Sequence, residues 1–107
     1  MFRVEVEDKE LLAKVRKAKQ EVYRKVMGEL LIGAKEIQSN AREIVPVDTG
    51  ALRRSIKHRR VEDGFAIGTN QVYAAPVEKK KPYLRPAFYN NYQRINKLVL
   101  ALIRKLL

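Results

Sequence analysis

The chain has 107 residues and a formal net charge of +11 at pH 7, with 46% hydrophobic and 33% charged residues. This composition excludes a disordered or membrane-embedded chain, and the length fits one domain that buries roughly 60 to 68% of its unfolded surface. We therefore expect residues 1–107 to form a single domain. The positive charge favours acidic partners, which could be nucleic acid, an anionic membrane surface or an acidic protein.

Cysteine is absent, which excludes disulfides, thiol catalysis and thiolate metal sites. The longest apolar run, residues 98–103, is far shorter than the ~20 residues of a membrane span. Glu5, Glu7 and Asp8 stand near the N-terminus, where a signal peptide would be apolar. We expect an intracellular, soluble protein with no membrane partner.

The first residues alternate between apolar and charged side chains. Phe2, Val4 and Val6 are separated by single charged residues, and this period of two predicts a strand over residues 2–7 with one buried face. Asp8 follows and can accept the free N–H groups at the start of a helix.

Apolar residues then recur every three or four positions, which predicts one long helix over residues 9–44. Such a helix would be about 50 Å long, so part of its apolar stripe is expected to contact another subunit. Gly28 and Gly33 indicate a kink or a close helix contact, or they are simply tolerated. The stripe consists of Leu11, Val15, Ala18, Val22, Val26, Leu30, Gly33, Ile37, Ala41 and Ile44.

Pro46 ends this helix, because the residue before a proline is pushed out of the helical region. Asp48 or Thr49 can cap a short helix over residues 49–55, with Leu52 facing the core. The helical period is then lost. The Asp-Gly pair at positions 63 and 64 separates two strand-like runs and predicts a β-hairpin over residues 56–69.

Residues 70–83 are predicted to form a loop. Its apolar part, residues 72–77, contains Pro76 and fits either an edge strand or a helical turn that ends early. The three lysines that follow form either a solvated turn or a contact with an acidic partner. These lysines are Lys79, Lys80 and Lys81.

A C-terminal helix is predicted over residues 86–106, with Pro86 in its first turn, where a missing N–H is tolerated. Its last ten residues are apolar on more than one face, which a small monomer would hardly cover. Val99, Leu102 and Leu106 are therefore expected to contact another subunit. The apolar stripe consists of Phe88, Tyr92, Ile95, Val99, Leu102 and Leu106.

Catalytic chemistry is not indicated. The single histidine, His58, lies among cations and has no carboxylate to orient it, so we expect a structural or exposed residue rather than a base. Asp48 and Thr49 could imitate a catalytic pair, but helix capping explains them. No metal-ligand spacing or phosphate loop is present, and we predict a protein that is not an enzyme and has no cofactor.

A basic cluster is the strongest chemical signal. In an extended strand Lys57 and Arg59 share one face while His58 and Arg60 share the other, so the cluster would not form one stripe. No aromatic residue interleaves with it, and we favour a solvated or protein-facing surface over a nucleic-acid groove. The cluster consists of Arg53, Arg54, Lys57, Arg59 and Arg60.

Together these elements predict an α+β fold, in which the long N-terminal helix and the C-terminal helix pack on a small, mainly antiparallel sheet. The chain resembles the tail-component family of HK-type lambdoid tailed phages. The resemblance rests on the segment from Pro46 to Ile56, on Tyr73-Ala74 and Val77-Glu78, and on the segment from Pro82 to Phe88. Its motif residues are Pro46, Asp48, Thr49, Gly50, Leu52, Pro82, Leu84, Arg85 and Pro86.

The resemblance implies a structural virion protein of a phage or prophage, described as a tail-completion, minor tail or head–tail joining protein that forms a ring at the neck. Its implied partners are copies of itself, connector or stopper proteins, and tail-tube or tail-terminator proteins, with DNA in the channel as a further candidate. Assembly in the host cytoplasm and a final place in the virion tail or neck follow.

One departure from the family pattern concerns the loop after Glu78, which in relatives usually continues with Gly-Thr and is longer. Here Glu78 runs directly into three lysines and Pro82. The partner contact of this loop is thus open, and a ring interface could be rebuilt around the lysines.

Two other functions compete with a neck protein. A small nucleic-acid-binding protein is suggested by the net charge and the basic cluster, and it would bind duplex DNA with a steep salt dependence. A toxin or antitoxin rests on size and charge alone and ranks last.

Overall fold

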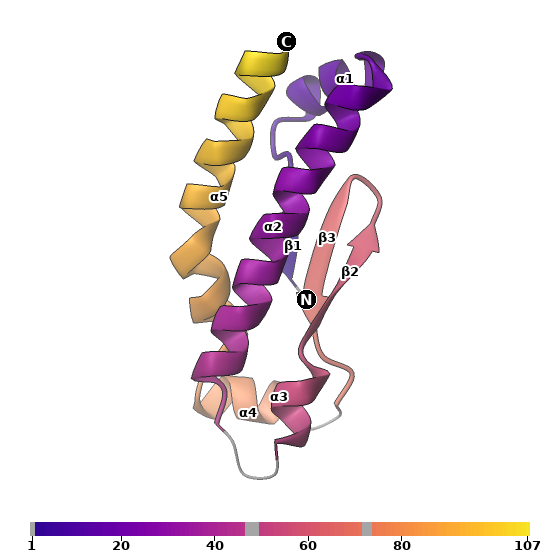
Figure 1. Ribbon diagram of the computed structural model, residues 1–107. Coiled ribbons are helices and arrows are strands. Elements are labelled where there is room, and N and C mark those ends of the chain that lie inside the picture. Colours follow the sequence, from indigo (N-terminus) through magenta and orange to yellow (C-terminus); the bar gives the residue numbers. More distant parts are fainter. Residues whose placement is uncertain (1, 47–49, 72–73) are drawn as a thin grey trace.

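Three strands and five helices make up the part of the chain described by a computed structural model, residues 2–46, 50–71 and 74–107. The strands form one small antiparallel sheet, and two long helices lie along it (Figure 1). The predicted α+β fold is therefore confirmed. In chain order the elements are β1 (Phe2–Glu5), α1 (Lys9–Lys17), α2 (Gln20–Ile44), α3 (Ala51–Ser55), β2 (Lys57–Val61), β3 (Gly64–Gly68), α4 (Ala74–Lys80) and α5 (Leu84–Leu106).

The sheet has the strand order β1-β3-β2, and β3 is antiparallel to both neighbours. Val4, Phe65 and Arg60 stand opposite one another in the register, so their side chains share one face, against which α2 packs. β1 ends at Glu5 because its partner Gly64 is the first residue of β3, and the residues after Glu5 have no strand beside them. The first strand is therefore shorter than predicted.

β2 and β3 form the predicted hairpin, but its turn consists of Glu62 and Asp63, since Val61 already pairs with Gly64. Asp63 has a φ of 57°, a left-handed conformation that aspartate adopts more readily than most residues. Gly64 belongs to the strand, and the constraint on it is steric rather than conformational. A Cβ at this position would overlap the carbonyl of Val4 in β1.

The helix predicted over residues 9–44 is divided into α1 and α2, which corrects the prediction of one continuous helix. Ala18 and Lys19 have extended backbones, with ψ of 178° and 145°. A straight helix over this range would be about 50 Å long, whereas the longest extent of the Cα trace is 47 Å. The break changes the direction of α1 at one end of the molecule (Figure 1), and Leu12 and Val15 join the core of the same chain.

The hairpin turn is tied to both helices beside this break. The carboxylate of Asp63 accepts a hydrogen bond of 2.8 Å from the hydroxyl of Tyr23 in α2 and pairs with Arg16 of α1. Arg16 also lies 3.3 Å from Glu62. These contacts hold the tip of the hairpin against the junction of α1 and α2.

α2 and α5 form the main helix pair of the core. Gly33 lies at a close approach of the two helices, because a Cβ there would stand 2.8 Å from the side chain of Ile95. Gly28 faces open space, with no atom within 4 Å of such a Cβ. α2 runs unbroken through both glycines. Of the interpretations offered for them, close helix contact applies to Gly33 and simple tolerance to Gly28.

α5 begins at Leu84, two residues before the predicted start, and Glu78 of α4 explains this beginning. The Glu78 carboxylate accepts hydrogen bonds from the backbone N–H groups of Tyr83 and Leu84, at 3.2 and 2.7 Å. Such N–H groups have no acceptor within the helix, and a negative charge is favoured at a helix N-terminus. Glu78 thus caps α5 from a neighbouring element.

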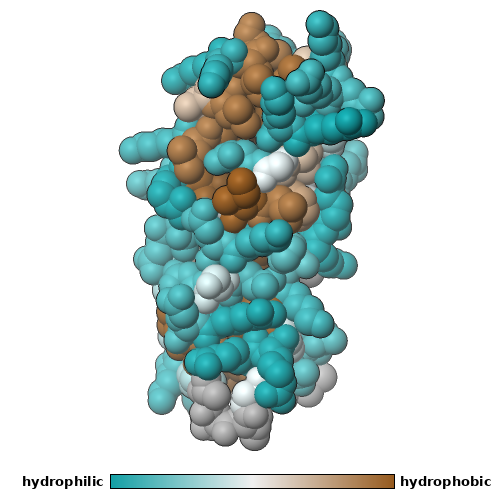
Figure 2. Space-filling model, in the orientation of Figure 1, coloured by the Kyte–Doolittle hydropathy of each residue, from teal (hydrophilic) through white to brown (hydrophobic). Residues whose placement is uncertain are grey.

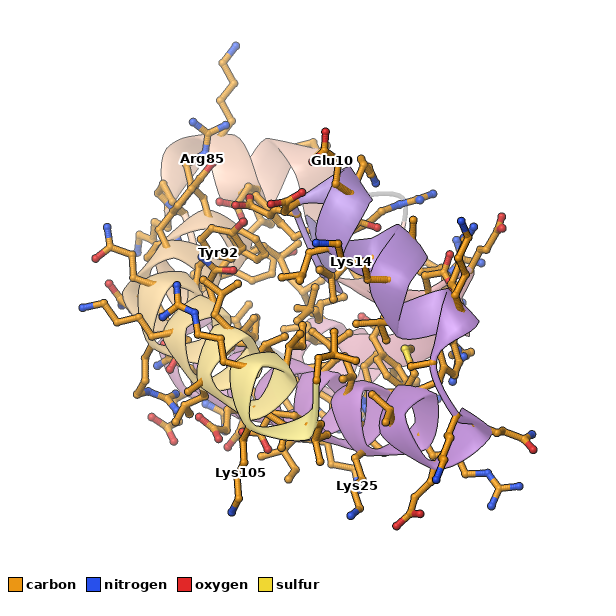
Figure 3. All side chains as sticks on the ribbon, turned by 90° about the horizontal axis from the view of Figure 1, so that it is seen from above. Glu10, Lys14, Lys25, Arg85, Tyr92 and Lys105 are labelled. Atoms are coloured by element: carbon orange, nitrogen blue, oxygen red, sulfur yellow. The ribbon has the colours of Figure 1, made fainter. Side chains whose placement is uncertain are left out.

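The buried stripe of α5 differs at its end from the predicted one. Phe88, Ile95 and Val99 are buried as expected, but Ile103 takes the last core position while Leu106 is only half-buried. Tyr92 points inward between the helices in the view along the long axis (Figure 3) and stacks on Phe88. The predicted alternation of fours and threes holds up to Val99, and the next core position then comes after four residues, at Ile103, instead of three.

The loop predicted over residues 70–83 contains α4, which corrects that prediction. Pro76 is the third residue of this helix, where an N–H has no intrahelical acceptor, so the proline does not interrupt it. α4 continues to Lys80, and the first two lysines of the basic run therefore belong to its last turn.

The short helix predicted over residues 49–55 begins at Ala51, and Gly50 precedes it with a left-handed φ of 81°. Leu52 is buried, as predicted, and so is Ile56 four residues later. The proposed capping residues Asp48 and Thr49 lie outside the described residues.

Replacing Gly33 with alanine should destabilise the protein by about 1–3 kcal/mol, because the new methyl group would push Ile95 away. This loss would occur although alanine is the better helix former by ~1 kcal/mol. Gly28→Ala is the matched control in the same helix and should raise stability by up to ~1 kcal/mol. Urea unfolding of both variants measures the difference, and a stabilising Gly33→Ala would contradict the close contact.

Glu78→Ala should lower the free energy of unfolding by about 1–3 kcal/mol, since two backbone N–H groups lose a charged acceptor. Glu43→Ala is the control, because Glu43 is exposed in the last turn of α2 and has no recorded bond to a described residue. It should change stability by less than ~0.5 kcal/mol. Equal losses in the two variants would show that Glu78 does not cap α5.

Candidate interaction surfaces

The outer side of the α2–α5 pair carries exposed apolar side chains. Ile32 of α2 is 53% exposed and Leu98 of α5 is 46% exposed. Figure 2 shows apolar side chains gathered on this side of the molecule, over the C-terminal half of α5 and the adjoining part of α2. Helical spacing places exposed Gly28 beside Ile32 and exposed Ala101 beside Leu98. We call Gly28, Ile32, Leu98 and Ala101 the apolar face.

Charged side chains lie around the apolar face. Lys25 of α2 and Lys105 of α5 project from the same side of the molecule (Figure 3). Lys25 pairs with Glu21 at 3.2 Å, and Arg94 of α5 pairs with Glu36 of α2. An apolar centre with a charged rim is the usual arrangement of a protein–protein interface.

The residues of α5 expected to contact another subunit are less accessible than Leu98. Val99 is 2% exposed and packs in the chain's own core, while Leu102 and Leu106 are half-buried. The sequence reasoning missed Ile32 and Leu98 because each lies beside an apolar stripe rather than on it. They could have been found as apolar residues at helix positions that face away from the core.

The basic cluster divides between the two faces of the sheet, as its alternation predicted. Arg60 turns toward the helices, where its guanidinium lies 5.5 Å from the centre of the Phe65 ring and donates to the Tyr23 hydroxyl at 3.3 Å. Lys57 and Arg59 belong to the opposite face, because they stand opposite Gly68 and Ala66 of β3. Arg3 of β1 is also opposite Ala66 and shares this open face.

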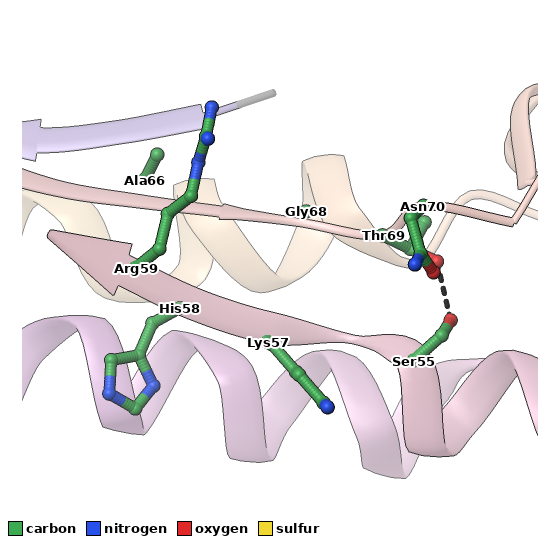
Figure 4. A pocket seen from close by; sticks show the side chains of 8 residues that line it. All are labelled: Ser55, Lys57, His58, Arg59, Ala66, Gly68, Thr69 and Asn70. Atoms are coloured by element: carbon green, nitrogen blue, oxygen red, sulfur yellow. Dashed lines mark hydrogen bonds between the residues drawn. The ribbon is translucent and has the colours of Figure 1, made fainter. Parts of the chain in front are cut away.

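A hollow of about 420 Å³ lies on the open face, beside the end of β2 (Figure 4). Small residues line its centre, since Ala66 and Gly68 of β3 have little or no side chain. The hydroxyls of Ser55 and Thr69 are in hydrogen-bond contact across it. No carboxylate is among the described residues that line the hollow: Ser55, Lys57, His58, Arg59, Ala66, Gly68, Thr69 and Asn70.

His58 is held as a structural residue. Its backbone N and its ring Nδ1 both lie 2.7 Å from the side-chain oxygen of Gln38 in α2. The guanidinium of Arg42, one turn further along α2, donates two hydrogen bonds to the carbonyl of Ile56. Side chains of α2 thus satisfy backbone groups at the outer edge of β2, an edge that would otherwise be open to pairing with another strand.

The two basic runs of the sequence meet at one end of the molecule. α3 and α4 both lie at this end (Figure 1), and the molecule is only 20 × 18 Å across its long axis. Their cations are exposed on both helices and on the connection to α5. We call the following residues the basic end: Arg53, Arg54, Lys79, Lys80, Lys81 and Arg85.

The motif residues mainly build this end of the fold. Leu52 and Leu84 are buried, whereas Pro82 is exposed and Pro46 and Pro86 are half-buried. Among the described residues no group of histidine and carboxylate side chains could hold a metal ion. Within the same residues, no helix combines the length and the apolar character needed to span a membrane.

Gln38→Ala should lower stability by about 1 kcal/mol, because the backbone N–H of His58 loses its acceptor. Gln93→Ala on the exposed surface of α5 is the matched control and should be close to neutral. Thermal unfolding measures both, and hydrogen exchange at His58 should become faster only in the Gln38 variant. Unchanged exchange at His58 would contradict this role of Gln38.

The chain matches one known protein family over most of its length. The family model described as "Bacteriophage HK97-gp10, putative tail-component" matches residues 9–81, which is more than half of the chain. No curated protein and no solved structure gives a match. The matched region extends from the start of α1 through the hairpin to Lys81 of the basic end. The chain therefore belongs to the HK97-gp10-like family of bacteriophage tail components and is a structural protein of the phage tail.

Proposed function

We propose that this protein is a ring-forming subunit at the junction of phage head and tail, acting in tail completion or head–tail joining. Membership of a tail-component family supports a role in the virion. The observation that carries the finer proposal is the apolar face, which the chain itself leaves uncovered. A structural subunit needs such a surface to contact its neighbours. His58, the single histidine, is bonded to Gln38 and does not form a catalytic site.

The occupant that we propose for the apolar face is a second copy of the chain. The face offers Ile32 and Leu98 as apolar anchors, and the adjoining Gly28 lets another backbone approach closely. Its rim contains charges of both signs, so the copies would not meet through like charges alone. The rest of a +11 surface would repel a copy more strongly.

A ring requires that this face meet a different surface of the next subunit. Contacts between two unlike surfaces repeat around an axis and close into a ring, whereas two identical faces in contact would end in a dimer. The elongated shape, 47 Å by 20 × 18 Å, gives each subunit separate ends and sides for neighbours above, below and beside it. The proposed neighbours at the ends are connector or stopper proteins and tail-tube or tail-terminator proteins.

The assembly proposal is tested with the double variant Ile32→Glu, Leu98→Glu. Burying two carboxylates in a contact without partners is costly, so its dissociation constant for self-association should rise at least about tenfold. Tyr89→Gln is the control, because Tyr89 is 61% exposed on α5 but outside the apolar face. Native mass spectrometry and sedimentation velocity report the assembly state.

The expected result is a closed oligomer larger than a dimer for the wild-type chain and the Tyr89 variant, and a monomer for the double variant. Thermal unfolding of all three proteins checks that exposed substitutions leave the fold intact. A double variant that assembles like the wild type would rule out the apolar face as the contact. A wild-type dimer would argue against a ring.

A further inference from the structure

We infer that the basic end, together with the open face of the sheet, binds the sugar–phosphate backbone of double-stranded DNA without sequence preference. The inference rests on the proposed function for its setting, a channel through which DNA passes. The binding itself is a property of the isolated chain. It is carried by the charge balance of one end of the molecule and by the chemistry of the adjoining hollow.

The described cations at this end outnumber the described carboxylates near them. The recorded ion pairs of the described chain lie elsewhere, on Arg16, Lys25 and Arg94. Two described carboxylates stand nearby, and both oxygens of one of them, Glu78, accept the hydrogen bonds that cap α5. The other, Glu43, shares a shallow hollow with Arg53. The described cations at this end are Arg42, Arg53, Arg54, Lys57, Lys79, Lys80, Lys81 and Arg85.

The hollow on the open face extends this surface with groups that suit a phosphate. Lys57 supplies charge, and Ser55 and Asn70 supply neutral polar groups. Protein contacts to the DNA backbone use these residue types. Ala66 is only 1% exposed, so a phosphate would reach the exposed side chains of Lys57 and Asn70 rather than the strand beneath them.

The composition favours DNA over an acidic protein as the partner. The centres of protein–protein interfaces are depleted in lysine, whereas lysine is a common phosphate contact. Half of the basic end is lysine, and the apolar anchors Ile32 and Leu98 lie on a different surface. The described aromatic residue between the lysines and α5, Tyr83, is fully buried, so no base could stack on it. Duplex DNA therefore fits better than a single strand.

The test compares two triple variants that each remove three positive charges. Lys79→Gln, Lys80→Gln, Lys81→Gln changes the basic end, and Lys14→Gln, Lys17→Gln, Lys19→Gln is the matched control. Both sets are exposed and lie in or just after the last turn of a short helix. Fluorescence anisotropy with a labelled duplex of random sequence, measured over a series of salt concentrations, gives the affinity and its salt dependence.

The wild-type chain should bind the duplex, with an affinity that falls as salt rises. The slope of log K against log salt should decrease by roughly 2 to 3 for the basic-end variant, because each lost phosphate contact removes ~0.9. Its affinity at low salt should fall at least about tenfold, and that of the control less than about threefold. Equal losses in both variants would show binding by net charge alone and would overturn the inference.

Two further outcomes would also overturn it. One is absence of duplex binding by the wild-type chain at low salt. The other is displacement of the duplex by poly-glutamate at equal charge concentration, which would indicate an acidic protein as the partner. Assembly measured on the same lysine variant separates the two proposals, because a chain that forms its oligomer but binds no DNA contradicts only this inference.

Discussion

The close approach of α2 and α5 at Gly33 and Ile95 is the contact on which the remaining structure depends. It brings two long helices together over one face of a sheet that is only three strands wide. A sheet of this size cannot form a stable core alone, and the helices supply most of the buried apolar surface. A larger residue at position 33 would separate them and open the core along its length.

α2 also organises the parts of the chain that lie outside this contact. Near its start, Tyr23 donates a hydrogen bond to Asp63 in the hairpin turn. Further along, Gln38 and Arg42 form hydrogen bonds with backbone groups at the start of β2. The helix thus fixes both ends of the hairpin. These bonds engage the start of the β2 edge, and the surfaces that we propose for partners are the apolar face and the basic regions.

Much of the fold could be predicted from the sequence because its signals are local. The alternation at Phe2 to Val6, the helical period before Pro46 and the Asp-Gly pair gave the strand, the helix and the hairpin. The break at Ala18 and Lys19 could not be predicted, since neither residue disfavours a helix strongly. α4 was missed because Pro76 resembles an interruption unless the helix start is known.

The candidate surfaces were harder to predict than the fold. The division of Lys57 and Arg59 from His58 and Arg60 followed from strand alternation alone. The meeting of the two basic runs at one end depends on how α3 and α4 are placed in space, which no local pattern specifies. The apolar face was missed for a similar reason, because Ile32 and Leu98 come from helices that are far apart in the sequence.

The cap at Glu78 has a mechanical consequence. Glu78 belongs to the same helix as Lys79 and Lys80, and its carboxylate holds the first N–H groups of α5. Three residues separate the two helices, and the cap spans them. The cap therefore ties the lysine segment to the start of α5, and Leu98 of the apolar face lies further along the same helix. A force on the lysines would thus pass through the Glu78 carboxylate to α5, the helix that carries part of the proposed subunit contact.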